Sequence, residues 1–197
     1  MARNIDKLNS ERDTVRSTHN VVIQIFPRFR RQVSAMWLQP IALAALESQA
    51  GLGSTIPDNR TWDVEVVVAD DKTVQELNQR YRGLDEVTDV LAFSPFHSGQ
   101  YEGTDAVQST FEPVVFPVTT AEQESLGVVL VAWHQAERQA KQAGHPVQHE
   151  LAVLIVHGIL HLLGHDHVNP EETKLMRNQE RIALDQVARN QKIGANQ

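Results

Sequence analysis

Residues 151–167 read LAVLIVHGILHLLGHDH. Apart from two histidines and a glycine, every residue up to Leu163 is apolar, and the pattern predicts a helix over 146–163. Because an α-helix turns about every 3.6 residues, His157 and His161 project from one face, about one turn apart. That spacing lets two imidazoles bind one metal ion.

A third histidine can join this pair. Gly164 is predicted to end the helix, since glycine readily adopts the left-handed conformation found there. The chain can then fold back and bring His165 or His167 to the same ion. Three neutral imidazoles and one open position are typical of catalytic zinc. The alternative is a set of hydrogen-bonded core histidines, but burying several without a shared partner costs a few kcal/mol each. We therefore predict a metal site.

The residues around the histidines limit the chemistry of such a site. In zinc peptidases of the H-E-x-x-H type, a glutamate follows the first histidine and acts as general base. Gly158 stands there in this chain, so a peptidase of that design lacks its base. Gly158 can instead let another backbone or a substrate approach the metal. Glu150, two turns before His157, either supports a ligand and proton transfer or is a helix-start carboxylate favoured by the dipole.

Two blocks of sequence resemble one known family. The motif H-G-x-L-H-L-x-G-x-D-H over 157–167 is similar to the signature of the YbeY family, metal-dependent endoribonucleases of bacterial ribosomal RNA maturation and ribosome quality control. LNQRYRG (77–83) and TDVLAF (88–93) are similar to the family's L-N-x-x-Y-R-G and T-D-V-L-x-F blocks. The chain departs from the family at His165, where an aromatic residue is usual, and at Val128, where an aspartate is usual.

The resemblance implies a site and a reaction. His157, His161 and His167 would bind one zinc ion. Independently of the resemblance, the spacing of the residues keeps His165 and Glu150 as a possible alternate ligand or as residues that support a ligand. The implied activity is that of a single-strand-specific, zinc-dependent endoribonuclease. Its implied partner is ribosomal RNA within the small ribosomal subunit, together with ribosome-associated proteins. The rival functions are a zinc-dependent peptidase and a non-catalytic ribosome-assembly factor whose metal is structural.

The resemblance also implies that Arg82 is an active-site residue, and a physical argument agrees. Hydrolysis of a phosphodiester places more negative charge on the non-bridging oxygens in the transition state. A guanidinium can donate two parallel hydrogen bonds to those oxygens. The alternative is a weak surface ion pair with Asp85 or Glu86. We favour the catalytic role.

The composition bounds the class of protein. A chain of 197 residues with 41% hydrophobic and 22% charged residues is typical of one globular domain. The absence of cysteine excludes disulfides, thiol nucleophiles and thiolate metal sites. A net charge of −7 argues against broad nucleic-acid binding, so we expect no DNA partner and interpret Arg28, Arg30 and Arg31 as solvated surface.

The N-terminal residues do not resemble a signal peptide, and no apolar run reaches transmembrane length. We therefore expect a cytoplasmic protein with no membrane partner.

The pattern of strands and helices predicts an α+β fold, with a four-stranded mixed sheet covered by about five helices and the site helix near the C-terminus. The predicted strands are 21–25, 62–69, 87–93 and 127–132. The predicted helices are two short or kinked pieces around Pro40 in 32–49, then 71–80, 132–143, 146–163 and one from Asn169.

The predicted domain plan places one catalytic domain at 21–190. It adds a flexible extension at 1–20, a long insert at 94–124 and a tail at 191–197.

Overall fold

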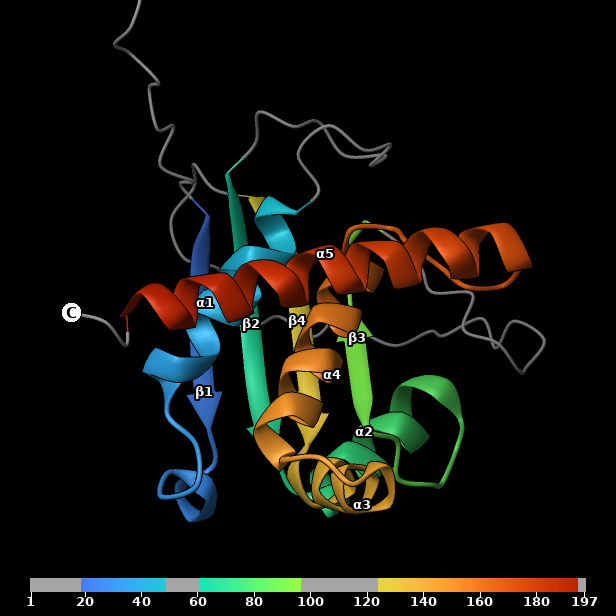
Figure 1. The fold of residues 1–197 in the computed structure, drawn as a ribbon. Coiled ribbons are helices and arrows are strands. Elements are labelled where there is room, and N and C mark those ends of the chain that lie inside the picture. Colours follow the sequence, from blue (N-terminus) through green and yellow to red (C-terminus); the bar gives the residue numbers. More distant parts are fainter. Residues whose placement is uncertain (1–18, 49–60, 97–123, 195–197) are drawn as a thin grey trace, which may run out of the picture.

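The fold is seen in a computed structural model that describes residues 19–48, 61–96 and 124–194, with side chains as far as 189 (Figure 1). The predicted insert and N-terminal extension lie almost wholly outside these ranges, so the domain plan stays a prediction. In chain order the elements are β1 (Asn20–Ile25), the 3-10 helix η1 (Pro27–Phe29), α1 (Ala35–Glu47), β2 (Trp62–Ala69), α2 (Asp71–Arg82), β3 (Val90–Phe93), β4 (Glu124–Ala132), α3 (Trp133–Ala143), α4 (Val147–Leu162) and α5 (Pro170–Gly194).

The four strands form one mixed sheet in the order β1-β2-β4-β3. Strands β1, β2 and β4 are parallel, and β3 runs antiparallel to β4 at one edge. With the α-helices this gives the predicted α+β fold. Within the described residues, no helix combines the length and the apolar character that crossing a membrane requires.

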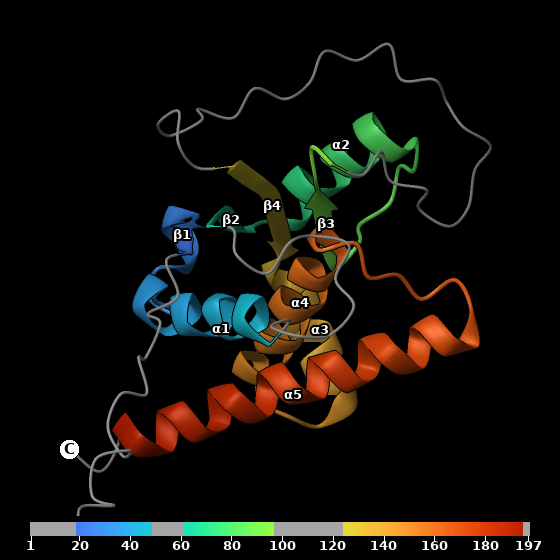
Figure 2. The same ribbon diagram turned by 90° about the horizontal axis from the view of Figure 1, so that it is seen from above.

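Helices cover both faces of the sheet (Figure 2). Because side chains alternate along a strand, Val129 and Val131 face the large core beneath α1 and α4, whereas Val128 and Leu130 face a smaller core beneath α2. Helix α5 lies across α1 and α4 and forms an outer layer (Figure 2). Helix α4 is therefore enclosed between the sheet and α5, which explains its nearly continuous apolar sequence.

Two glycines let α4 and β3 approach β4 closely. A Cβ atom at Gly158 would lie 2.5 Å from Cγ1 of Val129, so this position requires glycine for α4 to rest on the sheet. Gly127 has φ +137° beside an irregularity in the β2–β4 register, and a Cβ there would lie 2.1 Å from the carbonyl oxygen of Phe93. Gly158 thus serves helix packing, rather than the approach to the metal that the sequence suggested.

Helix α1 is one continuous helix, and Pro40 lies inside it. The prediction of two separate helices is therefore wrong, and a kink at Pro40 stays a prediction. A proline there removes the hydrogen bond to the carbonyl of Met36. Both residues are exposed, Met36 by 85%, so water can hydrate that carbonyl and the helix continues.

Strand β3 begins at Val90, three residues later than predicted. The preceding connection is held by side chains and by one backbone bond, in which the N–H of Ala132 on β4 donates to the carbonyl of Asp89 at 2.8 Å. Asn78, 1% exposed, donates from Nδ2 to the carbonyl of Glu86 at 2.9 Å. Asp89 accepts from the backbone N–H of Val90 at 2.8 Å and from Nε2 of Gln139 at 2.8 Å. The polar residues of the two family-like blocks therefore fix the route from α2 to β3.

Candidate metal centre

Three histidines converge where α4 ends. One ring nitrogen each of His157, His161 and His167 lies within 4.8 Å of the other two. Nε2 of His157 and Nε2 of His161 are 3.1 Å apart. The ring centroids are separated by 4.6 Å for His157–His161, 5.6 Å for His157–His167 and 5.2 Å for His161–His167. Three imidazole nitrogens so close together can hold one metal ion, and the structure brings together the three residues that the family resemblance named.

The end of α4 delivers the third histidine. Gly164 has φ 87°, the left-handed conformation predicted for it. Its N–H donates to the carbonyl of His161 at 3.0 Å, and the N–H of His165 donates to the carbonyl of Leu160 at 3.0 Å. These two bonds form the Schellman motif that commonly ends a helix. The chain therefore reverses within two residues, and His167 returns to the pair on the helix.

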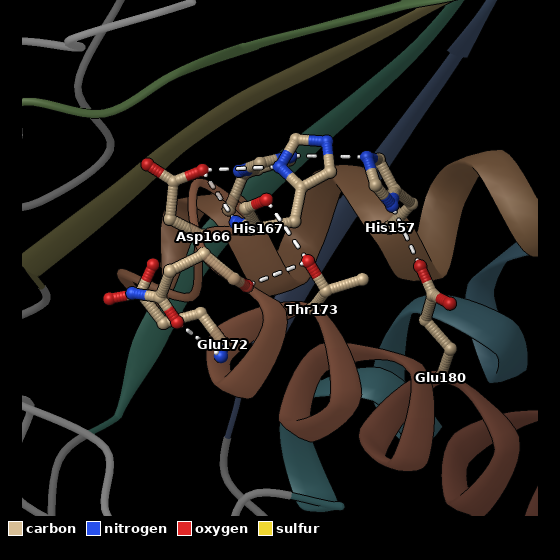
Figure 3. A network of polar contacts seen from close by, with 8 residues as sticks. His157, Asp166, His167, Glu172, Thr173 and Glu180 are labelled. Carbon is tan, nitrogen blue, oxygen red and sulfur yellow. Dashed lines mark hydrogen bonds and ion pairs between the residues drawn. The ribbon is translucent and has the colours of Figure 1, made fainter.

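Each ligand histidine has a partner for its other ring nitrogen (Figure 3). Nδ1 of His157 donates to Glu180 on α5 at 2.7 Å. Nδ1 of His167 lies 3.2 Å from Oδ1 of Asp166. The ring of His161 is hydrogen-bonded to the backbone of His165. Histidines that bind metals usually have such partners, which fix the ring orientation and the nitrogen that carries the proton. The donor set therefore fits a bound metal ion.

The electrostatics keep His161 neutral. Burial, together with the neighbouring rings of His157 and His167, lowers its pKa to about 4. Burial alone would raise the pKa of Asp166. Hydrogen bonds from the backbone and ring of His167 outweigh that effect, with help from the nearby imidazoles, so this carboxyl stays ionised at neutral pH. A neutral imidazole is the form that binds a metal, so this site is ready to bind one at neutral pH.

The two alternate residues take other places. His165 is buried, with 9% of its surface exposed, and it does not belong to the three-histidine cluster. Burial lowers its pKa. Glu150 pairs with Nε2 of His145 at 3.0 Å at the start of α4. Seven residues of helix separate Glu150 from His157 by about 10 Å along the axis, so the helix-start interpretation describes it better.

Arg82 lies on the face of the sheet opposite α4. It is the last residue of α2 and is half-buried. The ring of the preceding Tyr81 packs on Phe93, the last residue of β3, with centroids 5.2 Å apart. Phe93 in turn lies beside Leu162 of α4, since a Cβ at Gly127 would touch both residues. The C-terminal ends of α2, β3 and α4 are thus neighbours, and Arg82 lies at the histidine end of β3.

Sequence reasoning missed the two carboxylates that support the ligands. Asp166 stands inside the motif and was assigned no role. Glu180 lies 23 residues after His157 on another helix, and no local pattern connects the two. The general rule that a ligand histidine has a second partner predicts that some carboxylate exists, but only the packing of α5 on α4 identifies it.

Comparison with known proteins gives the family. Residues 33–188 match the family model described as Endoribonuclease YbeY. The chain belongs to the YbeY family. A relative named Endoribonuclease YbeY from Dehalococcoides mccartyi is 37% identical over 168 residues, which cover 85% of this chain and 95% of the relative. Another of that name, from Pelotomaculum thermopropionicum, is 42% identical over 123 residues, covering 62% and 70%.

A solved structure supports the fold. The solution structure of TM1509 from Thermotoga maritima aligns with a TM-score of 0.50 at 20% identity, covering 88% of this chain and 93% of that one. At Val128, where the YbeY pattern has aspartate, the side chain is 3% exposed and packs in the core beneath α2. In this chain the position therefore contributes to packing.

Proposed function

We propose that this chain is a zinc-dependent endoribonuclease that cleaves single-stranded RNA. The observation that carries the proposal is the cluster of three imidazole nitrogens within 4.8 Å in a member of the YbeY family. Relatives that share 34–42% of its residues are named endoribonucleases. We extend that activity to this chain and assign its metal as zinc, because three histidines with an open position are typical of catalytic zinc.

Five residues of the site would have roles in metal binding. His157, His161 and His167 would hold the ion through Nε2, while Glu180 and Asp166 keep two of the rings in place. Zinc, when bound, supplies Lewis acidity to the phosphodiester and activates a water molecule.

Arg82 would bind the substrate. We propose that its guanidinium donates paired hydrogen bonds to the non-bridging phosphate oxygens and binds them more strongly as charge develops. Its place at the histidine end of β3 supports this role. Because Arg82 is half-buried and is the last residue of a helix, its backbone is fixed, which favours a defined position for the guanidinium.

The substrate would be ribosomal RNA of the small subunit, in maturation and quality control in the cytoplasm. The net charge of −7 and the absence of an RNA-recognition motif in the sequence argue that the ribosomal particle or a partner protein selects the cleavage site. If the enzyme cut naked RNA at one position as accurately as RNA in the particle, this part of the proposal would fail.

A peptidase is the weaker candidate. The position of the usual glutamate base is Gly158, which packs against Val129 and has no room for a side chain. The alternative that is not an enzyme is a ribosome-assembly factor in which the metal only stabilises the fold.

One assay separates these three functions. The zinc-loaded protein is incubated with single-stranded RNA and with casein, each with and without a chelator. We expect chelator-sensitive cleavage of RNA alone. Cleavage of casein would favour the peptidase, and intact substrates in both tubes would favour the structural metal. RNA cleavage that survives in the double variant His157→Ala/His161→Ala would come from a contaminant.

A further inference from the structure

Three exposed basic residues lie along one side of the first half of α5. They are Lys174, Arg177 and Arg181, spaced by three and four residues, which puts them on one face of the helix. They extend over about 10 Å of helix axis. A nucleic-acid strand that runs along this face would therefore bring more than one phosphate within reach of the basic side chains.

This side of α5 borders the three histidines. Arg177 comes four residues after Thr173 and three before Glu180, so it shares a side of the helix with both. Thr173 donates from Oγ1 to the carbonyl of His167 at 3.0 Å, and Glu180 accepts from His157 at 2.7 Å. Figure 3 shows both side chains reaching from α5 toward the ligand histidines. Arg177 therefore lies at the rim of the candidate metal centre.

Acidic residues lie within one turn of this face, namely Glu171, Glu180 and Asp185, so the question is which of the basic side chains they hold. In the part of the chain that the structure describes, Lys174 and Arg177 take part in no ion pair. Arg181 pairs with Asp185 at 3.2 Å, but both side chains are more than half exposed, so the pair is weak. Within the described residues, the two carboxylates beside the three histidines hydrogen-bond histidine rings and none of these basic side chains. A strand of phosphates would thus meet basic groups beside the metal centre.

We propose that this face of α5 binds the backbone phosphates of the RNA strand next to the bond that is cut. Lys174 and Arg177 supply the main contacts, and Arg181 extends them when its pair with Asp185 opens. The identity of the strand as RNA rests on the function proposed above. The contacts are independent of sequence, and they explain how a chain with a net charge of −7 holds a polyanion at its active site.

The test is the salt dependence of RNA binding. A fluorescein-labelled single-stranded RNA of about 12 nucleotides is titrated with zinc-loaded protein at 4 °C across a range of KCl concentrations. Fluorescence anisotropy reports binding, and a denaturing gel of each sample reports cleavage. Each lost phosphate contact lowers the slope of log affinity against log salt by about 0.7 for a single strand. For Arg177→Gln we expect a slope that is smaller by this amount. With equal affinities of the two proteins at about 1 M KCl, the variant then binds the RNA about eightfold more weakly than the wild type at about 50 mM KCl.

Three further variants sharpen the result. Lys174→Gln/Arg177→Gln should lower the slope by about 1.4, whereas Arg177→Lys should keep it because the charge remains. Arg189→Gln is the matched control. Arg189 is an exposed arginine of α5 that lies about 18 Å beyond Arg177 along the helix axis, and this distance separates it from the metal centre. Its loss should leave the slope unchanged.

Two results would overturn the inference. One is an Arg177→Gln slope equal to that of Arg189→Gln, and the other is a wild-type protein that does not bind the RNA. The gel keeps this separate from the proposed function. Altered slopes with intact RNA in every sample would uphold the binding face and refute the nuclease. Normal cleavage with equal slopes for Arg177→Gln and Arg189→Gln would uphold the nuclease and refute the binding face.

Discussion

A histidine that binds a metal presents one ring nitrogen to the ion, and the partner of the other nitrogen decides which one it is. For His157 that partner is Glu180, which accepts from Nδ1 at 2.7 Å and leaves Nε2 to face His161. Without the carboxylate, the ring can rotate and change tautomer, and the imidazole becomes a weaker base. We therefore propose that Glu180 positions the His157 ring for metal binding.

The variant Glu180→Ala should weaken zinc binding about 10–100-fold. Competition with a fluorescent chelator measures the dissociation constant. Glu171→Ala, which removes an exposed carboxylate from the first turn of the same helix, should leave it unchanged. Equal zinc affinity in the two variants would show that the 2.7 Å contact has no part in metal binding.

Arg82→Ala should act on chemistry, with zinc content and melting temperature preserved. Loss of one charge-assisted contact to the transition state typically costs about 2–4 kcal/mol, or about 30- to 1000-fold in single-turnover rate. Arg82→Lys should recover little, because an ammonium cannot make the paired contact. Single-turnover cleavage at saturating enzyme is the measurement. A normal rate would return Arg82 to the surface ion-pair interpretation, and lost zinc would make its role structural.

At the scale of elements, the sequence predicted those features whose hydrogen-bond partners lie only a few residues away along the chain. Asp70 accepts from the N–H of Thr73 at 2.8 Å, and α2 begins at Asp71, where the predicted helix 71–80 begins. Gly164 ends α4 for the same kind of reason, since its conformation and bonds involve only its neighbours. The site histidines belong to this class, because two turns of helix and one reversal bring them together.

The predictions that failed depend on tertiary surroundings. Pro40 lies inside α1, where solvent can hydrate the carbonyl that loses its hydrogen bond, so the helix is not divided in two. The start of β3 depends on Asn78, which holds Glu86 in the connection, and on Asp89, whose partner Gln139 lies on α3. The role of Gly158 follows from the distance between α4 and β4, which no spacing of residues within one helix can show.

The packing of α4 on the sheet gives an element-scale prediction. Gly158→Ala would bring a Cβ to 2.5 Å from Val129, and such overpacking typically destabilises a protein by about 1–3 kcal/mol. Gly144→Ala is the comparison. Nothing lies within 4 Å of a Cβ there, so only its positive φ of 72° opposes the change, at about 1 kcal/mol. Urea unfolding should rank Gly158→Ala as the less stable variant. The opposite order would mean that α4 can shift freely on the sheet.

At the scale of the whole molecule, the buried site makes stability depend on pH. The pKa of His161 is lowered from 6.5 to about 4 by burial and by its two neighbouring imidazoles. Between pH 6.5 and about 4, His161 is protonated in the unfolded chain and neutral in the folded chain, so acid favours unfolding. The metal-free protein should therefore lose stability as pH falls from 6.5 to about 4, by as much as about 3 kcal/mol.

Urea unfolding of the chelator-treated protein at several pH values measures this effect. His161→Gln removes the titrating ring and should flatten the curve between pH 6.5 and 4. If His161→Gln keeps the wild-type dependence of stability on pH, other titratable groups cause that dependence.

The central claim is that His157, His161 and His167 bind one zinc ion. Elemental analysis of the protein, purified without chelator and then dialysed against zinc, tests it most directly. We predict about one zinc per chain in the wild type and in His165→Ala, and a loss of zinc in His157→Ala and His167→Ala, with all four proteins folded by circular dichroism. A wild-type chain that holds no zinc after dialysis, or a His167→Ala variant that keeps its full complement, would contradict the account.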